Sequence, residues 1–139
     1  MILVDNSQVI LSGIFAHTRG DTTNIDENLV RHMALNSYKW IRNRFSNEYG
    51  ELVICEDSKD CWRKNFFPLY KAARKKSHEK DNNDWRAIYE TLTKIRNEVR
   101  ETFPYKNMKV ENCEADDIIA VITRQNCDYC NNIMIKYSF

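Results

Sequence analysis

The most informative part of the sequence is NCEADDIIAVI, residues 112–122, where a cluster of acids runs directly into an apolar segment. Glu114, Asp116 and Asp117 lie within four residues of one another. Carboxylates this close repel, and each disfavours ionisation of its neighbours. The apolar spacing that follows predicts a helix over residues 114–124 with these acids in its first turn. Taken alone, the stretch is explained by a capped helix end that faces water.

The rest of the chain predicts an α/β fold around this helix. Short buried runs rich in β-branched residues alternate with longer amphipathic segments, and Asp84 is a good N-cap for one of them. Strand, helix, strand, helix, strand, helix, strand is the order typical of a parallel central sheet flanked by helices on both faces. The predicted strands are residues 2–4, 52–55, 108–110 and 132–136, and the predicted helices are residues 6–17, 24–45, 85–99 and 114–124.

Acids follow three of the predicted strands. Asp5 ends the first strand, Glu56 and Asp57 end the second, and the acidic trio follows the third. In a parallel sheet these ends share one edge, which is where ligands bind. Carboxylates that lie this close repel one another unless a cation binds between them, and their oxygen ligands favour Mg²⁺ or Mn²⁺. Since residues 114 and 117 are one helical turn apart and Asp116 points elsewhere, we do not expect all three to bind one ion directly.

A second feature is a basic strip, residues 62–80, in a chain whose formal net charge is only +1. It carries seven Lys and Arg residues against one acid, with Trp62, Phe66, Phe67 and Tyr70 interleaved. Cations neutralise phosphates and aromatic faces stack on unpaired bases. The alternative is a solvated basic helix with a buried aromatic side. Next to a metal-binding edge, the strip favours phosphodiester chemistry, in which metal ions activate water and stabilise the leaving oxygen.

Several other classes of protein have no support. The N-terminal segment lacks a signal-peptide pattern and no run has transmembrane length, so we expect a cytoplasmic protein that does not bind membranes. Five cysteines without secretory context predict reduced thiols, and Cys127 with Cys130 has metal-knuckle spacing but lacks a second pair. Neither GxxxxGK[ST] nor GxGxxG occurs. His78 is expected on a solvated surface.

The motifs together resemble the 5′-nuclease superfamily of flap endonucleases and 5′–3′ exonucleases. Four segments carry the resemblance in the expected order, and CEADDIIA after a strand is the most specific of them. The resemblance implies a nuclease core of the kind also seen in PIN domains. It also implies Mg²⁺-dependent cleavage at 5′ ends or flaps of DNA, or of RNA–DNA primers as in ribonuclease H-type primer removal during phage replication. The segments are ILVDNSQVIL, LVRHMALNSYKWI, LVICEDSKDCWRKNFFPLYKAARKK and FPYKNMKVENCEADDIIAVI.

The resemblance also implies roles for individual residues. Five acids match the first metal site: Asp5, Asp57, Glu114, Asp116 and Asp117. Lys71 and Arg74 match catalytic cations that grip the scissile phosphate, within an arch or bridge region at residues 62–80. The residues expected to bind nucleic acid are Arg63, Lys64, Tyr70, Lys71, Arg74, Lys75 and Lys76.

One departure from the family pattern limits these expectations. Family members carry a further Asp pair after the last strand, whereas this chain reads NIMIKYSF and has no Asp after Asp128. Residues 1–139 are therefore expected to be the N-terminal part of a nuclease domain, truncated at its C-terminal side and without the helical DNA-binding region. Three alternatives stay open: a nuclease half completed by a second chain, a non-catalytic DNA-binding remnant, and an unrelated acidic-pocket domain such as a phosphatase or a receiver-like domain.

Overall fold

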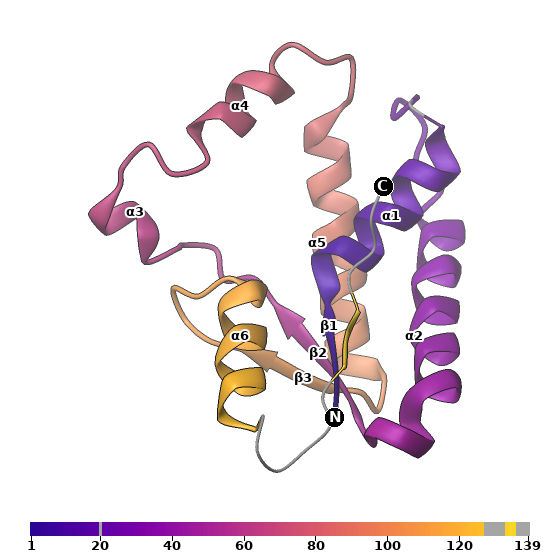
Figure 1. The fold of residues 1–139 in the computed structure, drawn as a ribbon. Coiled ribbons are helices and arrows are strands. Elements are labelled where there is room, and N and C mark those ends of the chain that lie inside the picture. The colour runs from indigo at the N-terminus through magenta and orange to yellow at the C-terminus, as the bar shows by residue number, and fades with distance from the viewer. Residues whose placement is uncertain (20, 127–132, 136–139) are drawn as a thin grey trace.

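The computed structural model describes residues 1–19, 21–126 and 133–135. The chain runs from strand to helix and back, as the sequence predicts (Figure 1). The elements are β1 (Ile2–Asp5), α1 (Asn6–Thr18), α2 (Glu27–Tyr49), β2 (Leu52–Glu56), α3 (Arg63–Phe66), α4 (Ala72–His78), α5 (Trp85–Thr102), β3 (Lys106–Lys109), α6 (Ala115–Gln125) and β4 (Ile133–Ile135).

The four strands form one parallel sheet in the order β3-β2-β1-β4. The register pairs Asp5 with Cys55, and Cys55 in turn with Met108. All the described strand pairs are parallel, so the carboxyl ends of β1, β2 and β3 lie at the same edge. The prediction of an α/β fold with a parallel central sheet is confirmed.

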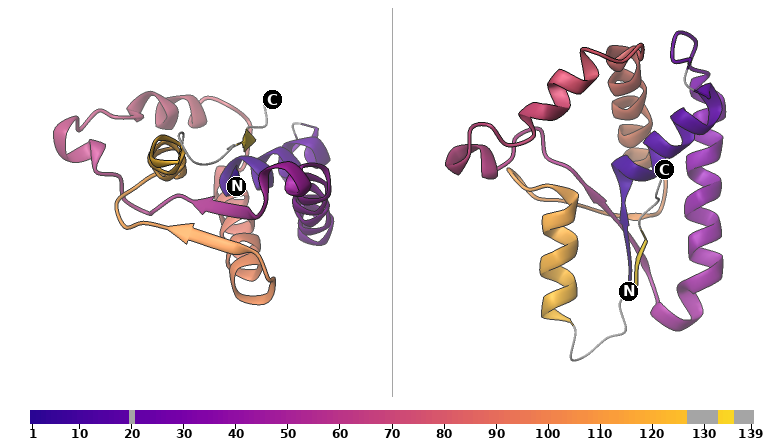
Figure 2. Two further views of the ribbon diagram at one scale, coloured as in Figure 1. Left: turned by 60° about the horizontal axis from the view of Figure 1, so that its bottom comes forward. Right: turned by 45° about the horizontal axis from the view of Figure 1, so that its top comes forward.

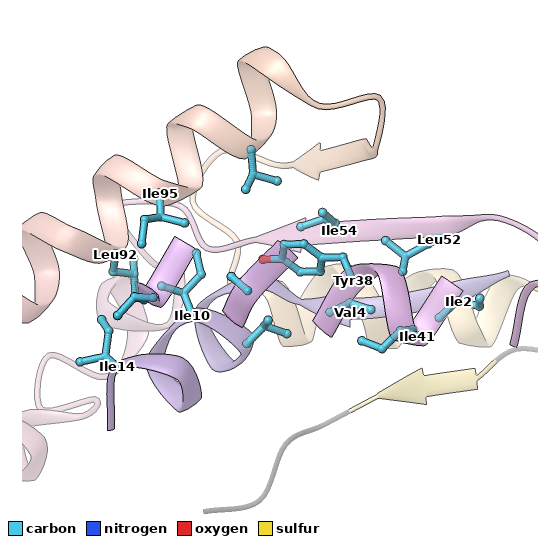
Figure 3. Close-up of a cluster of buried hydrophobic side chains, with 14 of the residues drawn as sticks. Ile2, Val4, Ile10, Ile14, Tyr38, Ile41, Leu52, Ile54, Leu92 and Ile95 are labelled. Atoms are coloured by element: carbon cyan, nitrogen blue, oxygen red, sulfur yellow. The ribbon is translucent and has the colours of Figure 1, made fainter. Parts of the chain in front are cut away.

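Each face of the sheet has its own apolar core, because side chains alternate along a strand. Ile2, Val4 and Ile54 point to the face covered by α1, α2 and α5, where Tyr38 is fully buried (Figure 3). Leu3 and Val53 point to the opposite face, which α6 covers with Ala115, Ile118 and Ile119. Figure 2 shows α6 standing apart from the other three long helices. Burial on both faces explains why β1 and β2 read as continuous apolar runs.

Aspartates begin the three helices that pack on the larger core. The side chain of Asp5 accepts a hydrogen bond from the Gln8 N–H, that of Asp26 from the Asn28 and Leu29 N–H groups, and that of Asp84 from the Ala87 N–H. These bonds satisfy backbone donors that have no partner inside a helix. Asp84 is thus the N-cap that the sequence predicts, and α5 ends just before Pro104.

The structure differs most from the predicted elements in two regions. The basic strip holds two short helices, α3 and α4, that carry it away from the sheet edge and back to α5 (Figure 1). The third strand covers residues 106–109 instead of 108–110, since β3 is an edge strand with mostly exposed side chains and hence a weak apolar pattern.

Three cysteines lie in the described part of the chain, Cys55, Cys61 and Cys113, and all carry free thiols. The Cys127–Cys130 pair lies outside the described residues. Among the described helices, none is both long enough and apolar enough to cross a bilayer.

Candidate functional site

The acids predicted to hold a metal come from three separate segments, and four of them line one cavity of about 880 Å³ at the carboxyl edge of the sheet. Asp5 ends β1, Asp57 follows β2, and Glu114 and Asp116 stand at the start of α6. Lys71 and Arg74 of the basic strip line the same cavity. The structure therefore brings the two predicted catalytic cations to the predicted metal acids.

Asp5 is the most deeply buried of these acids, with 7% of its surface exposed. Burial, the largest cause, and the nearby charges of Asp57 and Asp116 together raise the pKa of its carboxyl to about 6, while the Gln8 backbone hydrogen bond opposes the rise. The acids are thus close enough to repel one another. A cation in this cavity would relieve that repulsion.

Asp57 connects two helix starts. Its Oδ2 accepts a hydrogen bond of 2.6 Å from the Ser7 hydroxyl in the first turn of α1, and its Oδ1 accepts one of 2.9 Å from the Ala115 N–H at the first residue of α6. The contact fixes α6, and with it Asp116, relative to β2.

Glu114 is held by cations and a hydroxyl of the basic strip. Its Oε1 accepts a hydrogen bond of 2.5 Å from Lys71 Nζ, and its Oε2 accepts bonds from the Tyr70 hydroxyl at 2.8 Å and Arg63 Nη1 at 3.3 Å. Burial works to raise the pKa of Glu114, but the Lys71 and Tyr70 hydrogen bonds and the charges of Lys71 and Arg63 leave it below its usual range. Lys71 makes this contact from a left-handed backbone conformation, φ 58°, which costs an ordinary residue about 1–2 kcal/mol.

Asp117 faces the basic strip and is not among the residues that line the acidic cavity. Arg63 Nη1 and Nη2 donate to its two oxygens at 2.8 and 2.5 Å, and the Trp62 indole N–H donates to Oδ2 at 3.2 Å. The same oxygen accepts the Glu114 N–H at 3.0 Å. Glu114 and Asp117, one helical turn apart, thus share Arg63 as a partner, whereas Asp116 points elsewhere, as predicted, and lines the acidic cavity with Asp5 and Asp57.

Part of the basic strip lines a neighbouring cavity of about 480 Å³. Lys64, Tyr70, Lys71 and Arg74 line it together with Asp57 and Glu114, so the two cavities share several walls. Lys76 is exposed on α4, and the side chain of Lys75 lies outside the described part of the structure. The strip thus presents cations around the acids.

Sequence reasoning missed the contribution of α5, which it treated only as a core helix. Tyr89, Thr93 and Arg96 line the acidic cavity, and Arg96 Nε is buried without a hydrogen-bond partner. The signal was present in the sequence, since positions 89, 93 and 96 follow the spacing of one helix face. His78 also differs from expectation, because it stacks on Trp85 and lines the second cavity.

The donor set fits a hard divalent cation, because every acid on the cavity offers oxygen ligands. Within residues 1–19, 21–126 and 133–135, no three His, Cys, Asp or Glu side chains come close enough together to chelate an ion by themselves. This arrangement suits Mg²⁺, which commonly keeps several waters and uses one or two carboxylates together with substrate phosphate oxygens.

A family model described as the N-terminal resolvase-like domain of 5′–3′ exonucleases matches residues 1–136. The chain belongs to the 5′–3′ exonuclease family. This 5′–3′ exonuclease-family chain is 33% identical over 126 residues to ribonuclease H of enterobacteria phage T4, an alignment that covers 88% of this chain and 41% of the phage T4 protein.

Solved structures share the fold of this 5′–3′ exonuclease-family chain. The bacteriophage T5 5′-exonuclease with bound divalent metal ions (zinc) superposes with a TM-score of 0.70 at 14% identity, covering 98% of this chain and 48% of that one. A bacteriophage T5 flap endonuclease pseudo-enzyme–product complex with DNA and metal ions gives the same score and identity, with 97% and 47% covered. The chain therefore spans less than half the length of these relatives.

Proposed function

We propose that this chain carries the metal-binding and phosphate-binding core of a 5′-nuclease that hydrolyses phosphodiester bonds at 5′ ends or flaps. Its substrates would be DNA or RNA–DNA primer strands, and its metal Mg²⁺ or Mn²⁺. The observation that carries the proposal is one cavity lined both by Asp5, Asp57, Glu114 and Asp116 and by Lys71 and Arg74. Acids for a metal and cations for a phosphate in one place are what phosphodiester hydrolysis requires.

The relatives support this proposal by their descriptions. The phage T4 relative is a ribonuclease H. One T5 structure is described with divalent metal ions (zinc), and the other with DNA and metal ions. Their shared fold places parallel-strand ends at the corresponding edge, where ligands bind in open α/β sheets.

Each group on the cavity has a proposed role. Asp5, Asp57, Glu114 and Asp116 would hold the metal, and a bound divalent ion supplies an activated water and polarises the phosphate. Arg74 and Lys71 would neutralise the phosphate that flanks the cleaved bond. Because Lys71 is bonded to Glu114, we infer that it exchanges this carboxylate for a phosphate oxygen when substrate enters. Asp117 would act through Arg63 by holding the start of the basic strip.

The test is cleavage of an end-labelled 5′-flap duplex in Mg²⁺, with and without chelator. Asp116→Asn should lower the cleavage rate by roughly 100-fold or more, because it removes a charge that faces the metal position. Asp26→Asn, the same chemical change at the N-cap of α2 and outside the cavity, should leave the rate unchanged. Cleavage that survives both chelation and Asp116→Asn would refute the proposal.

A non-catalytic DNA-binding role is the second candidate. It is favoured by the lack of a ready chelating group among the described side chains and by the pairing of Glu114 and Asp117 with protein cations. A nuclease half that needs a second chain would behave in the same way when alone. Salt-sensitive DNA binding that Lys71→Ala and Arg74→Ala weaken, without cleavage in Mg²⁺ or Mn²⁺, would favour this candidate.

A further inference from the structure

Three aromatic residues join α4 to the start of α5. The His78 ring stacks on Trp85 with 3.5 Å between ring centroids and 10° between planes. Tyr89, one turn further along α5, lies 5.8 Å from Trp85 and 6.3 Å from His78. The Trp85 indole N–H donates to Asp81 at 2.7 Å, which fixes the indole orientation. The Tyr89 ring is therefore supported from one side by an ordered aromatic pair.

Tyr89 nevertheless leaves 49% of its surface exposed, although its neighbours Ile88 and Leu92 are buried in the core. A pairing with Trp85 at i, i+4 would account for an exposed Tyr that only stiffens the helix. The position of Tyr89 argues for more, because it lines both cavities of the site together with Lys71 and Arg74. An exposed aromatic face thus stands beside the cations proposed to bind phosphate.

The residues that line the two cavities beside Tyr89 indicate which kind of ligand would bind there. Lys71, Arg74 and Arg96 favour an anionic chain, and an aromatic face next to cations suits a base attached to a phosphate. Bases inside a duplex are already stacked on each other, so the base that Tyr89 can accept is an unpaired one. Tyr70, the aromatic residue that the sequence indicated, is bonded to Glu114 and has Arg63 and Lys71 near its ring.

We propose that Tyr89, backed by Trp85 and His78, is a stacking platform for an unpaired base of the 5′ strand next to the cavity that holds Lys71 and Arg74. The inference rests on the proposed function for its substrate class. It adds a binding residue on α5, outside both the acidic trio and the basic strip.

The test measures binding of two short single strands to the full chain in chelator, one of thymidines and one with abasic residues throughout. Tyr89→Ala should weaken thymidine binding by about 5- to 30-fold, and Tyr89→Phe should stay within about twofold of wild type. Both proteins should bind the abasic strand equally. The slope of log affinity against log salt should be unchanged by Tyr89→Ala, whereas Arg74→Ala should make it shallower by about 0.7, the value for one phosphate contact.

Trp40→Ala is the matched control, because Trp40 is an exposed aromatic of α2 that lines neither cavity. The inference is overturned if Tyr89→Ala binds thymidines like wild type, or if it loses equal affinity for the abasic strand. Equal wild-type affinity for the two strands would overturn it without any variant. Loss of binding in Arg74→Ala alongside a silent Tyr89→Ala would leave the proposed function standing and remove this inference alone. No binding of any strand by wild type would instead remove the proposed function.

Discussion

Arg63 and Asp117 form a two-point ion pair between the basic strip and α6, with Nη1–Oδ2 and Nη2–Oδ1 distances of 2.8 and 2.5 Å. The parallel fork lowers the pKa of Asp117 and raises that of Arg63, each through the hydrogen bonds they share. Arg63 also lies over the Trp62 ring, 4.7 Å from its centroid. The pair fastens α3 to the helix that carries Asp116, although the two residues are 54 positions apart in the sequence.

Breaking this ion pair should loosen α3 without unfolding the sheet. Asp117→Asn removes the charge, and Arg63→Lys keeps the charge but loses the planar fork. Each change should speed amide hydrogen exchange in residues 63–67, and the double variant should be no faster than the single ones, because both remove one interaction. Arg86→Lys, in an exposed pair with Glu90, is the control. Additive effects, or unchanged exchange, would contradict this role.

Asp5 should make the stability of the chelator-treated protein depend on pH. Its pKa in the fold is about 6, above the ordinary 3.8, so the folded state retains a proton that the unfolded state has released. This contribution is present below about pH 4 and is lost as the pH rises through 6. Asp5→Asn, which keeps a capping oxygen, should therefore exceed wild type in free energy of unfolding above pH 6, by up to about 3 kcal/mol.

Urea unfolding at pH 4 and pH 8 with chelator measures this difference. The advantage of Asp5→Asn should grow between the two pH values and shrink when Mg²⁺ is added to wild type at pH 8, since a bound cation stabilises the ionised acids. Asp26→Asn, at the exposed cap of α2, controls for the change in capping group. An equal difference in unfolding free energy at both pH values would show that the pKa of Asp5 is not raised in the fold.

Arg100 should be important for stability because of its partner. Glu56 is fully buried at the end of β2, and Arg100 Nη1 lies 3.2 Å from its Oε2. Arg100→Ala leaves that carboxylate unpaired, which should cost about 3 kcal/mol of unfolding free energy. Arg100→Ala combined with Glu56→Gln should recover part of the loss. A midpoint of thermal unfolding that Arg100→Ala leaves unchanged would mean that solvent satisfies Glu56.

Most of the fold could be predicted from local patterns. Ile2, Val4 and Ile54 belong to apolar runs buried on both faces of the sheet, and such runs are distinctive. Asp84, the predicted N-cap, correctly marked the start of α5. The two helices of the basic strip were not predicted, because they are short and have no buried apolar stripe. The predicted bounds of β3 were wrong because its edge position leaves Met108 exposed.

The site could be predicted only at the level of which segments meet. The parallel strands bring Asp5, Asp57 and the start of α6 to one edge of the sheet, whichever way their side chains point. Which acid turns inward depends on distant partners. Arg63 binds Asp117 away from the acidic cavity, and Lys71 binds Glu114 from 43 positions away in the sequence. No local sequence pattern predicts these two contacts. The face of α5 that carries Tyr89 was overlooked because its opposite face dominates the helical pattern.

Anomalous diffraction from crystals of the chain soaked in Mn²⁺ tests directly whether the acids of the cavity bind a metal. We expect an anomalous peak inside the cavity between Asp5, Asp57, Glu114 and Asp116, and no such peak in Asp116→Asn crystals treated identically. Wild-type crystals without a peak in that cavity, or with Mn²⁺ bound only elsewhere, would contradict the claim that these acids form a metal site.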